Sequence, residues 1–191
     1  MTCIGIVPQV SGVGGMVSFR GKFTTGLQVR GIEVTHNAQL PTLDSLLVIG
    51  GTRDLPGLWR AKRRGVRIVQ RLNGMNWLHR LQRTGIKHYL RALYGNWNLQ
   101  YIRSRLADHI VYQSDFARQW WESVYGLTPV SGSVVHNAVD LAIYSPSPRH
   151  APPSTHFRVL LVEGSLMGGY ELGLETAVKL VELLNTEYHE Q

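Results

Sequence analysis

The sequence predicts an α/β fold, a Rossmann-like parallel sheet with helices on both faces. Short apolar runs of strand length alternate along the chain with longer segments whose apolar residues recur at helical spacing. Turns that contain glycine separate several of these segments. Regular alternation of strand and helix favours a mostly parallel sheet, because each connection between parallel strands then runs through a helix that covers one face.

The first elements are predicted between residues 4 and 69. Residues 4–7 form a buried strand, and the glycine-rich turn 11–15 leads into a helix over 16–30 with apolar residues at helical intervals. Gly31 stands at the stop position of this helix. Three further strands are predicted at residues 32–34, 46–49 and 66–69.

A long helix is predicted over residues 82–105, with a break near Gly95. Its apolar stripe is Ile86, Leu90, Leu93, Trp97 and Tyr101, and the basic stripe is Arg80, Arg83, Lys87 and Arg91. We expect the basic stripe to contact an anionic lipid or polyphosphate, although a solvated helix face has the same pattern.

A fifth strand is predicted over 109–112, and Ser114 then caps a helix over 115–125 that stops at Gly126. Phe116, Trp120 and Val124 share one face of this helix, so that Trp121 points elsewhere. A sixth strand follows over 133–135. Trp97, Trp120 and Trp121 are expected in the core or at its rim rather than as stacking platforms.

Proline marks a domain boundary, because four of the eight prolines lie within residues 145–153. We predict a Rossmann-like domain over 1–144, a linker over 145–156 and the start of a second domain over 157–191, with a strand at 157–162, a glycine-containing loop and a last helix. One strand and one helix cannot bury their apolar faces alone, so this second domain is expected to be incomplete.

Composition narrows the class of protein. The 191 residues are 43% hydrophobic, which is enough for a packed core, and the single cysteine, Cys3, excludes an internal disulfide framework. The sequence has no apolar run of about 18 residues and no signal-peptide pattern at its start. We therefore expect a cytoplasmic protein.

The positive charge is concentrated in one block. Residues 60–105 hold 12 of the 20 Lys and Arg residues and no Asp or Glu, whereas residues 163–191 hold six of the 13 acids. Such a block indicates an anionic partner. We expect peripheral contact with the inner face of a membrane through residues 60–105, and no nucleic acid.

Polar residues follow two of the predicted strands, and ligands of parallel sheets bind at the carboxyl ends of strands. Arg71 and Asn73 follow the fourth strand, and His136 and Asn137 follow the sixth. We therefore expect all four at a ligand cleft. For the first pair an ordinary Asn-Gly turn with a solvated arginine is the alternative.

Other site patterns are weak. The turn 11–15 has glycines that allow backbone N–H groups to approach an anion, but it lacks the dinucleotide fingerprint and a Walker lysine. Trp77 and His79 either line the cleft or pack a loop. The eight histidines show no metal-ligand spacing, and no nucleophile elbow is present, so the catalytic residues stay unassigned.

Several segments together resemble a known family. Four segments resemble the second half of the amino-terminal domain of family 4 glycosyltransferases. They are IVYQSDF at 110–116, which covers a strand and the start of a helix, the pairs at 120–121 and 125–126, and VVHNAVD at 134–140 with Pro146. Three further segments are similar to the family. Gly14-Gly15 resembles its glycine pair before the first helix, and residues 30–35 resemble the start of its second strand. Residues 157–180 resemble the first strand and helix of its carboxyl-terminal domain.

The resemblance implies a retaining, metal-independent GT-B glycosyltransferase with two Rossmann-like domains facing a cleft, and we expect no cofactor. The donor would be a UDP- or GDP-type nucleotide sugar and the acceptor a glycan or lipid. Gly14, Gly15, Gly168 and Gly169 would approach the donor phosphates, and Arg71, Asn73, His136, Asn137 and Asp140 would line the cleft on the acceptor side.

The sequence departs from the family pattern in four places. Ala138 replaces the usual glycine, and Arg71-Leu72-Asn73-Gly74 stands where many relatives carry a histidine. Residues 159–178 contain no Lys or Arg for the donor phosphates, so either the backbone at 168–169 suffices or Arg71 supplies the charge. The late Glu-x7-Glu segment of the family is not in the sequence, so we expect the 191 residues alone to be an incomplete, inactive enzyme.

Two other functions remain open. A non-catalytic Rossmann-like module would bind an anionic polymer or a membrane surface through residues 60–105. A sugar-nucleotide epimerase would share the two-domain architecture, but the order of the Ser-x-Phe and Asn-x-Val-Asp segments argues against it.

Overall fold

The computed structural model describes residues 2–12, 14–81, 83, 85–145, 160–162 and 171–189. The chain forms two compact units, Met1–Ala138 and Val139–Gln191. The first unit contains the whole sheet and five of the six α-helices that the structure describes. The boundaries predicted for the domains and the linker stay a prediction.

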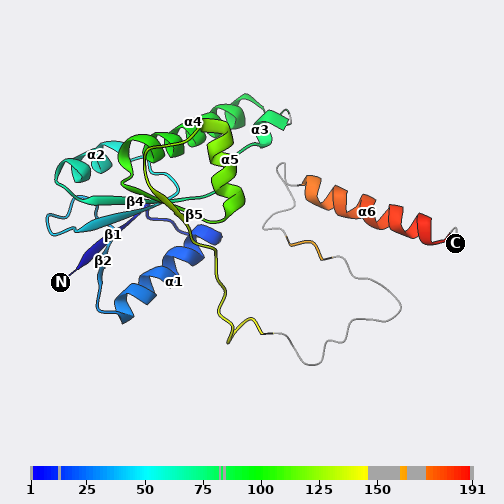
Figure 1. Ribbon diagram of the computed structural model, residues 1–191. Helices are drawn as coiled ribbons and strands as arrows, with labels where there is room; N and C mark the ends of the chain where they lie inside the picture. The colour runs from blue at the N-terminus through cyan, green and yellow to red at the C-terminus, as the bar shows by residue number, and fades with distance from the viewer. Residues whose placement is uncertain are drawn as a thin grey trace. The chain divides into compact units, whose positions relative to one another are not determined.

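The first unit is built on a six-stranded parallel sheet with the strand order β2-β1-β3-β4-β5-β6 (Figure 1). The strands are β1 Cys3–Val7, β2 Glu33–Thr35, β3 Ser45–Ile49, β4 Arg67–Leu72, β5 His109–Tyr112 and β6 Gly132–Val134. Each pair of neighbours is parallel, which confirms the predicted fold class. β4 extends to Leu72, three residues beyond the predicted strand, so Arg71 lies within the sheet.

Helices cover both faces of this sheet. They are α1 Gly15–Val29, α2 Leu55–Arg63, α3 Leu78–Leu81, α4 Ile86–Tyr101 and α5 Asp115–Tyr125, and the π-helix Ile102–Leu106 continues α4. α1 lies on one face, where its Phe19 packs against Ile6 and Ile49. α2, α4 and the π-helix lie on the other face (Figure 1), where Leu58 and Ile102 pack against strand residues.

Helix α2 was not predicted, because Pro56 and Gly57 in its first turn are typical of a loop. Proline is tolerated there, since the first N–H groups of a helix have no partner within the helix. The Asp54 carboxylate caps the helix by accepting a hydrogen bond from the amide of Gly57 at 2.8 Å. Leu58 and Ala61 are buried, so the helix is held by packing on the sheet.

The long helix differs from its prediction in its limits, and much of its apolar stripe is exposed. It begins at Ile86, passes through Gly95 without a break and ends in the π-helix. In the predicted apolar stripe Ile86, Leu90 and Trp97 are exposed, whereas Leu93 is half-buried and Tyr101 packs against the core. The residues that α4 buries are Ala92, Asn96 and Asn98. The buried asparagines hold neighbouring loops: Asn96 exchanges two hydrogen bonds with the backbone of Asn76, and Asn98 donates to the carbonyl of Thr52.

Helix α5 has the predicted limits, with the Ser114 hydroxyl accepting a hydrogen bond from the amide of Ala117 at 3.1 Å. The prediction of its apolar face was only partly right. Trp120 and Val124 pack against the core, but Phe116 is exposed and the fully buried residue is Trp121. The large ring points into the core next to β4 and β5, because the indole N–H finds a backbone partner there.

The second unit contains helix α6, Glu171–His189, which includes the predicted last helix. Residues 160–162 are not in a strand; the rest of the predicted strand 157–162, residues 146–156 of the linker, and Gly168 and Gly169 lie outside the described residues. In the part of the chain that the structure describes, no helix is long and apolar enough to cross a membrane.

Candidate functional site

The carboxyl ends of the strands meet at one edge of the sheet. β1 pairs with β2 on one side and with β3 on the other, so consecutive connections leave in opposite directions at this point. Such a switch in strand order opens a crevice at the carboxyl ends, where ligands of doubly wound sheets bind. The turn into α1 follows β1 and the pair Gly50-Gly51 follows β3, so both lie at this edge of the sheet.

A closed ring of four polar side chains occupies the same edge at the ends of β4, β5 and β6. The Arg71 guanidinium donates to Asn73 Oδ1 at 3.4 Å and to Asn137 Oδ1 at 2.5 Å. The Asn137 amide donates to Gln113 Oε1 at 3.0 Å, and the Gln113 amide donates to Asn73 Oδ1. We call Arg71, Asn73, Gln113 and Asn137 the polar ring.

The polar ring contains a buried cation without a counter-charge. Arg71 is only 6% exposed, and among the described residues no carboxylate forms an ion pair with it. Its guanidinium lies over the Phe19 ring of α1, 3.7 Å from the ring centre, which is a cation–π contact. Burial lowers the pKa of Arg71 from its ordinary value, yet arginine keeps its charge in proteins.

Asn73 is anchored from both sides. The indole N–H of Trp121 donates to the Asn73 carbonyl at 2.8 Å, and the Gly50 amide donates to the neighbouring Arg71 carbonyl at 2.7 Å. A side chain at Gly50 would come within 3.8 Å of the Asn73 amide, and the φ of +72° also favours glycine. Backbone hydrogen bonds therefore fix the position of Arg71 and Asn73 in the polar ring.

The glycine turn lies at the amino end of α1. Gly14 has φ +142°, a conformation that residues with a Cβ rarely adopt, and both Gly14 and Gly15 are exposed. The first turn of α1 holds no acidic residue, so its free N–H groups and the helix dipole favour an anion. Phe19, one turn further along α1, connects this turn to the polar ring.

The structure brings three of the predicted cleft residues together: Arg71, Asn73 and Asn137 are members of the polar ring. His136 follows β6 at the same edge, but its side chain is exposed and points to the Asp115 carboxylate, 3.9 Å away. Asp140 belongs to the second unit, where its carboxylate accepts a hydrogen bond from the amide of Ala142.

Sequence reasoning missed two residues of the site. Gln113 directly follows β5, and the rule that indicated Asn73 and Asn137 applies to it equally. Phe19 had no such signal, because a helical apolar residue is normally core. Trp77 packs edge-on against Trp120, and His79 is buried against Tyr89, with burial lowering its pKa. Both therefore pack the loop after β4 and its neighbours rather than line an open cleft.

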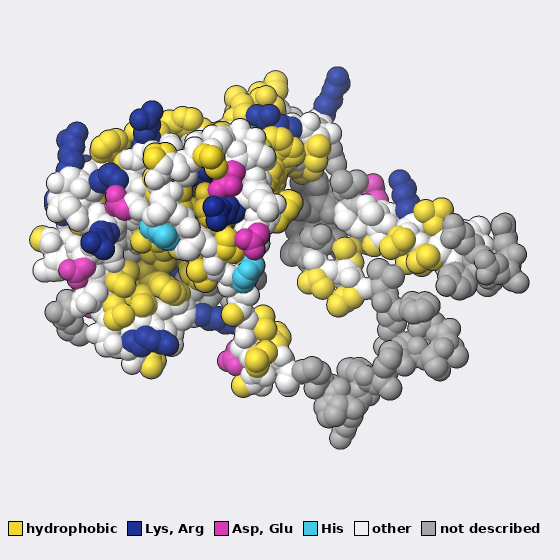
Figure 2. All heavy atoms as spheres, in the orientation of Figure 1, with side chains coloured by type: hydrophobic (Ala, Val, Ile, Leu, Met, Phe, Trp, Pro, Cys, Tyr) yellow, Lys and Arg dark blue, Asp and Glu magenta, His cyan; other side chains and the backbone are white. Residues whose placement is uncertain are grey.

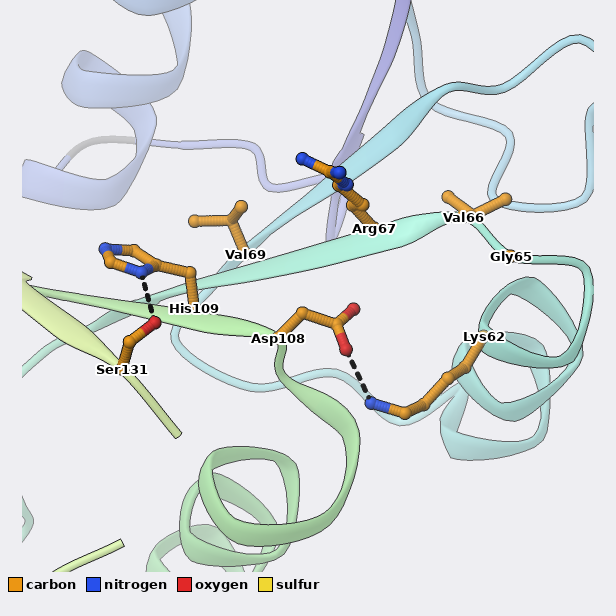
Figure 3. A pocket seen from close by; sticks show the side chains of 8 residues that line it. All are labelled: Lys62, Gly65, Val66, Arg67, Val69, Asp108, His109 and Ser131. Atoms are coloured by element: carbon orange, nitrogen blue, oxygen red, sulfur yellow. Dashed lines mark hydrogen bonds and ion pairs between the residues drawn. The ribbon is translucent and has the colours of Figure 1, made fainter. Parts of the chain in front are cut away.

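A cavity of about 660 Å³ lies at the opposite edge, where β4 and β5 begin (Figure 3). The Asp108 carboxylate accepts hydrogen bonds from the amide of Ile68 and from Lys62 Nζ, both at 2.8 Å. The Lys62 ammonium also donates to the carbonyl of Leu106. These contacts tie α2 and the π-helix to the start of β4, so this edge has a structural role.

Asp108 gives a prediction for acid stability. Burial alone would raise the pKa of this carboxyl, but the Ile68 amide and the Lys62 ammonium outweigh burial and hold the pKa below its ordinary value. A lowered pKa in the folded state stabilises the protein above the unfolded value of about 3.9, and this contribution disappears as the pH falls through the folded pKa. We expect Asp108→Asn to be less stable than wild type at neutral pH, with the difference narrowing below about pH 4. Urea unfolding over this pH range measures it, and a difference that does not change with pH contradicts the prediction.

The fold is a Rossmann-like α/β domain, and its polar ring lies at the carboxyl ends of the strands, the edge where such sheets bind ligands. Residues 51–143 match the family model described as Glycosyltransferase Family 4. The matched segment contains the entire polar ring, whereas the glycine turn and Phe19 lie before it. This match supports a glycosyltransferase family 4-like domain, a glycosyltransferase function in general terms, and a sugar donor and an acceptor as partners. Comparison with curated proteins and with solved structures gave no match.

Proposed function

We propose that the first unit is the acceptor-side domain of a GT-B glycosyltransferase that transfers a sugar from a UDP- or GDP-type nucleotide sugar to a glycan or lipid acceptor. The family match gives the class, and the buried, unpaired guanidinium of Arg71 carries the proposal for the site. A buried charge without a counter-charge costs stability, and groups in such perturbed environments cluster at functional sites.

In this proposal Arg71 faces the phosphates of the donor. Transfer breaks the bond between the anomeric carbon and the donor phosphate oxygen, and negative charge grows on the leaving diphosphate. A fixed cation and a helix amino terminus stabilise that charge without needing a metal ion. Gly14 and Gly15 contribute backbone N–H groups, and Arg71 replaces the cation that residues 159–178 do not provide.

The amides of the polar ring serve the acceptor. Asn73, Gln113 and Asn137 offer donors and acceptors that match sugar hydroxyls, and their mutual hydrogen bonds fix the orientation of each amide. His136 and Asp140 follow β6 in the sequence, as Asn137 does, and are proposed to complete the acceptor side. Gly168 and Gly169 are proposed on the donor side of the second domain. We propose that the transferred sugar retains its anomeric configuration, and this part rests on the family resemblance alone.

The proposal is tested by nuclear magnetic resonance, because three members of the polar ring carry side-chain NH₂ groups with separate signals. We titrate the ¹⁵N-labelled chain with UDP, GDP, pyrophosphate and a panel of oligosaccharides. Diphosphates are expected to shift the Arg71 Nε–H and the amides of the glycine turn. Oligosaccharides are expected to shift the NH₂ signals of Asn73, Gln113 and Asn137.

Gln28 is the internal control, since its exposed side chain lies near the carboxyl end of α1, away from the carboxyl ends of the strands. Its NH₂ signal is expected to stay in place. Shifts confined to the basic region 60–105 outside Arg71, or no shifts with any diphosphate or saccharide, would overturn the proposed site. The alternative of a non-catalytic anion-binding module predicts the first of these results.

A further inference from the structure

Helix α4 presents an apolar face to the outside. Ile86 is 79% exposed, Leu90 58% and Trp97 49%, and Tyr89 and Tyr94 are exposed as well. The 16 residues of α4 give this face a length of about 24 Å. A surface helix usually buries its apolar residues and exposes its polar ones, whereas α4 exposes these apolar residues and buries asparagines. Contiguous exposed apolar surface of this kind marks an interaction site.

The apolar face continues into a groove between α2 and α4. The groove has a volume of about 490 Å³ and is lined by Leu55, Pro56, Trp59, Arg60, Arg63, Trp97 and Tyr101. Trp59 donates a hydrogen bond from its indole N–H to the Tyr101 hydroxyl at 3.0 Å, and Arg63 lies over the Trp59 ring. Tryptophan and tyrosine side chains, which combine an apolar ring with a polar N–H or O–H group, favour the membrane–water interface, and arginine side chains lie beside them here.

The charged side chains of α4 and of the groove lining are all positive. Lys87 and Arg91 of α4 are exposed beside the apolar residues, and Arg60 and Arg63 are exposed beside the groove. Residues 60–105 contain no Asp or Glu. Along the upper margin of Figure 2, over α3 and α4, hydrophobic side chains and Lys or Arg side chains lie next to one another. Apolar surface flanked by cations is complementary to an anionic lipid surface.

We infer that the outer face of α4 and the groove beside α2 form a membrane-binding surface for anionic lipids, with the helix lying in the plane of the interface. A second copy of the chain is not a suitable partner for this surface, because a symmetric dimer would bring the cations of both copies together. This inference is independent of the function proposed for the polar ring.

The experiment is co-sedimentation of the full chain with vesicles. We expect binding to phosphatidylcholine vesicles that contain roughly one third phosphatidylglycerol, and little binding to pure phosphatidylcholine. Lys87→Gln with Arg91→Gln is expected to lower the partition coefficient about 25-fold, since each basic residue near an anionic surface contributes roughly fivefold. Leu90→Ser with Trp97→Ser is expected to lower it at least tenfold, roughly the effect of losing two apolar anchors.

Matched control variants separate this surface from general charge and hydrophobicity. Arg30→Gln with Lys179→Gln removes the same charge elsewhere, and Val29→Ser with Leu127→Ser removes exposed apolar side chains elsewhere. Both are expected to bind vesicles like wild type. Circular dichroism should show native folding for every variant, because all these positions are exposed.

Three results would overturn the inference. One is equal binding to neutral and anionic vesicles. The second is vesicle binding that the α4 variants leave unchanged. The third is self-association in sedimentation velocity that Leu90→Ser with Trp97→Ser abolishes, with no vesicle binding by wild type; the face would then be an interface between copies of the chain.

Discussion

Replacing Trp121 with alanine is expected to lower the free energy of unfolding by about 3–5 kcal/mol, as truncation of a large buried aromatic residue does. The side chain is 0% exposed and packs among Leu72, Ile110 and Tyr112. Its indole N–H also holds the Asn73 carbonyl, which would lose its partner. The expected loss is a large part of the total stability of a domain of this size.

Chemical denaturation measures the effect, with two companion variants. Trp121→Phe keeps one aromatic ring but removes the hydrogen bond and part of the packing, so we expect an intermediate loss of about 1–3 kcal/mol. Phe116→Ala truncates an aromatic residue on the same helix that is 70% exposed, and we expect a change within about 0.5 kcal/mol. If Phe116→Ala destabilises the protein as much as Trp121→Ala, the burial in α5 described above is wrong.

The sheet and most helices were predictable because local patterns agree with the fold. Ser114 and Gly126 mark both ends of α5, and the apolar runs coincide with the strands. The burial of α4 was not predictable from periodicity. A period identifies the stripes of a helix, but the side that faces the sheet was decided here by Asn96 and Asn98, whose partners are loops distant in sequence.

Much of the polar ring was predictable for a different reason. Arg71, Asn73 and Asn137 were indicated by their place at or after the carboxyl ends of strands, and parallel pairing brings those ends together. The closure of the polar ring depends on register, which pairs Leu72 with Tyr112 and Tyr112 with Val134. Sequence alone does not give that register, nor the contact of Arg71 with α1.

Removing the guanidinium of Arg71 is expected to separate function from stability. Arg71→Met should weaken the binding of UDP, GDP and pyrophosphate about 10- to 100-fold, because a hydrogen bond to a charged group contributes roughly 1.5–3 kcal/mol. The free energy of unfolding should change by no more than about 1 kcal/mol, because two hydrogen bonds are lost while the cost of burying an unpaired charge disappears. Asn73 Oδ1 keeps its bond from Gln113, and the exposed Asn137 can bond to water.

Two further variants make this prediction specific to the polar ring. Arg67→Met changes an exposed arginine on the same strand at the opposite edge of the sheet, and it should leave diphosphate binding unchanged. Arg71→Lys keeps the charge but not the two-pronged contact with Asn73 and Asn137, so its affinity should fall between those of wild type and Arg71→Met. Titrations followed by the backbone amide signals of the glycine turn give the diphosphate affinities, and thermal or urea unfolding gives the stability. A structural arginine would give the reverse pattern, in which Arg71→Met unfolds the domain or loses more than about 3 kcal/mol while the remaining folded protein binds diphosphates as wild type does.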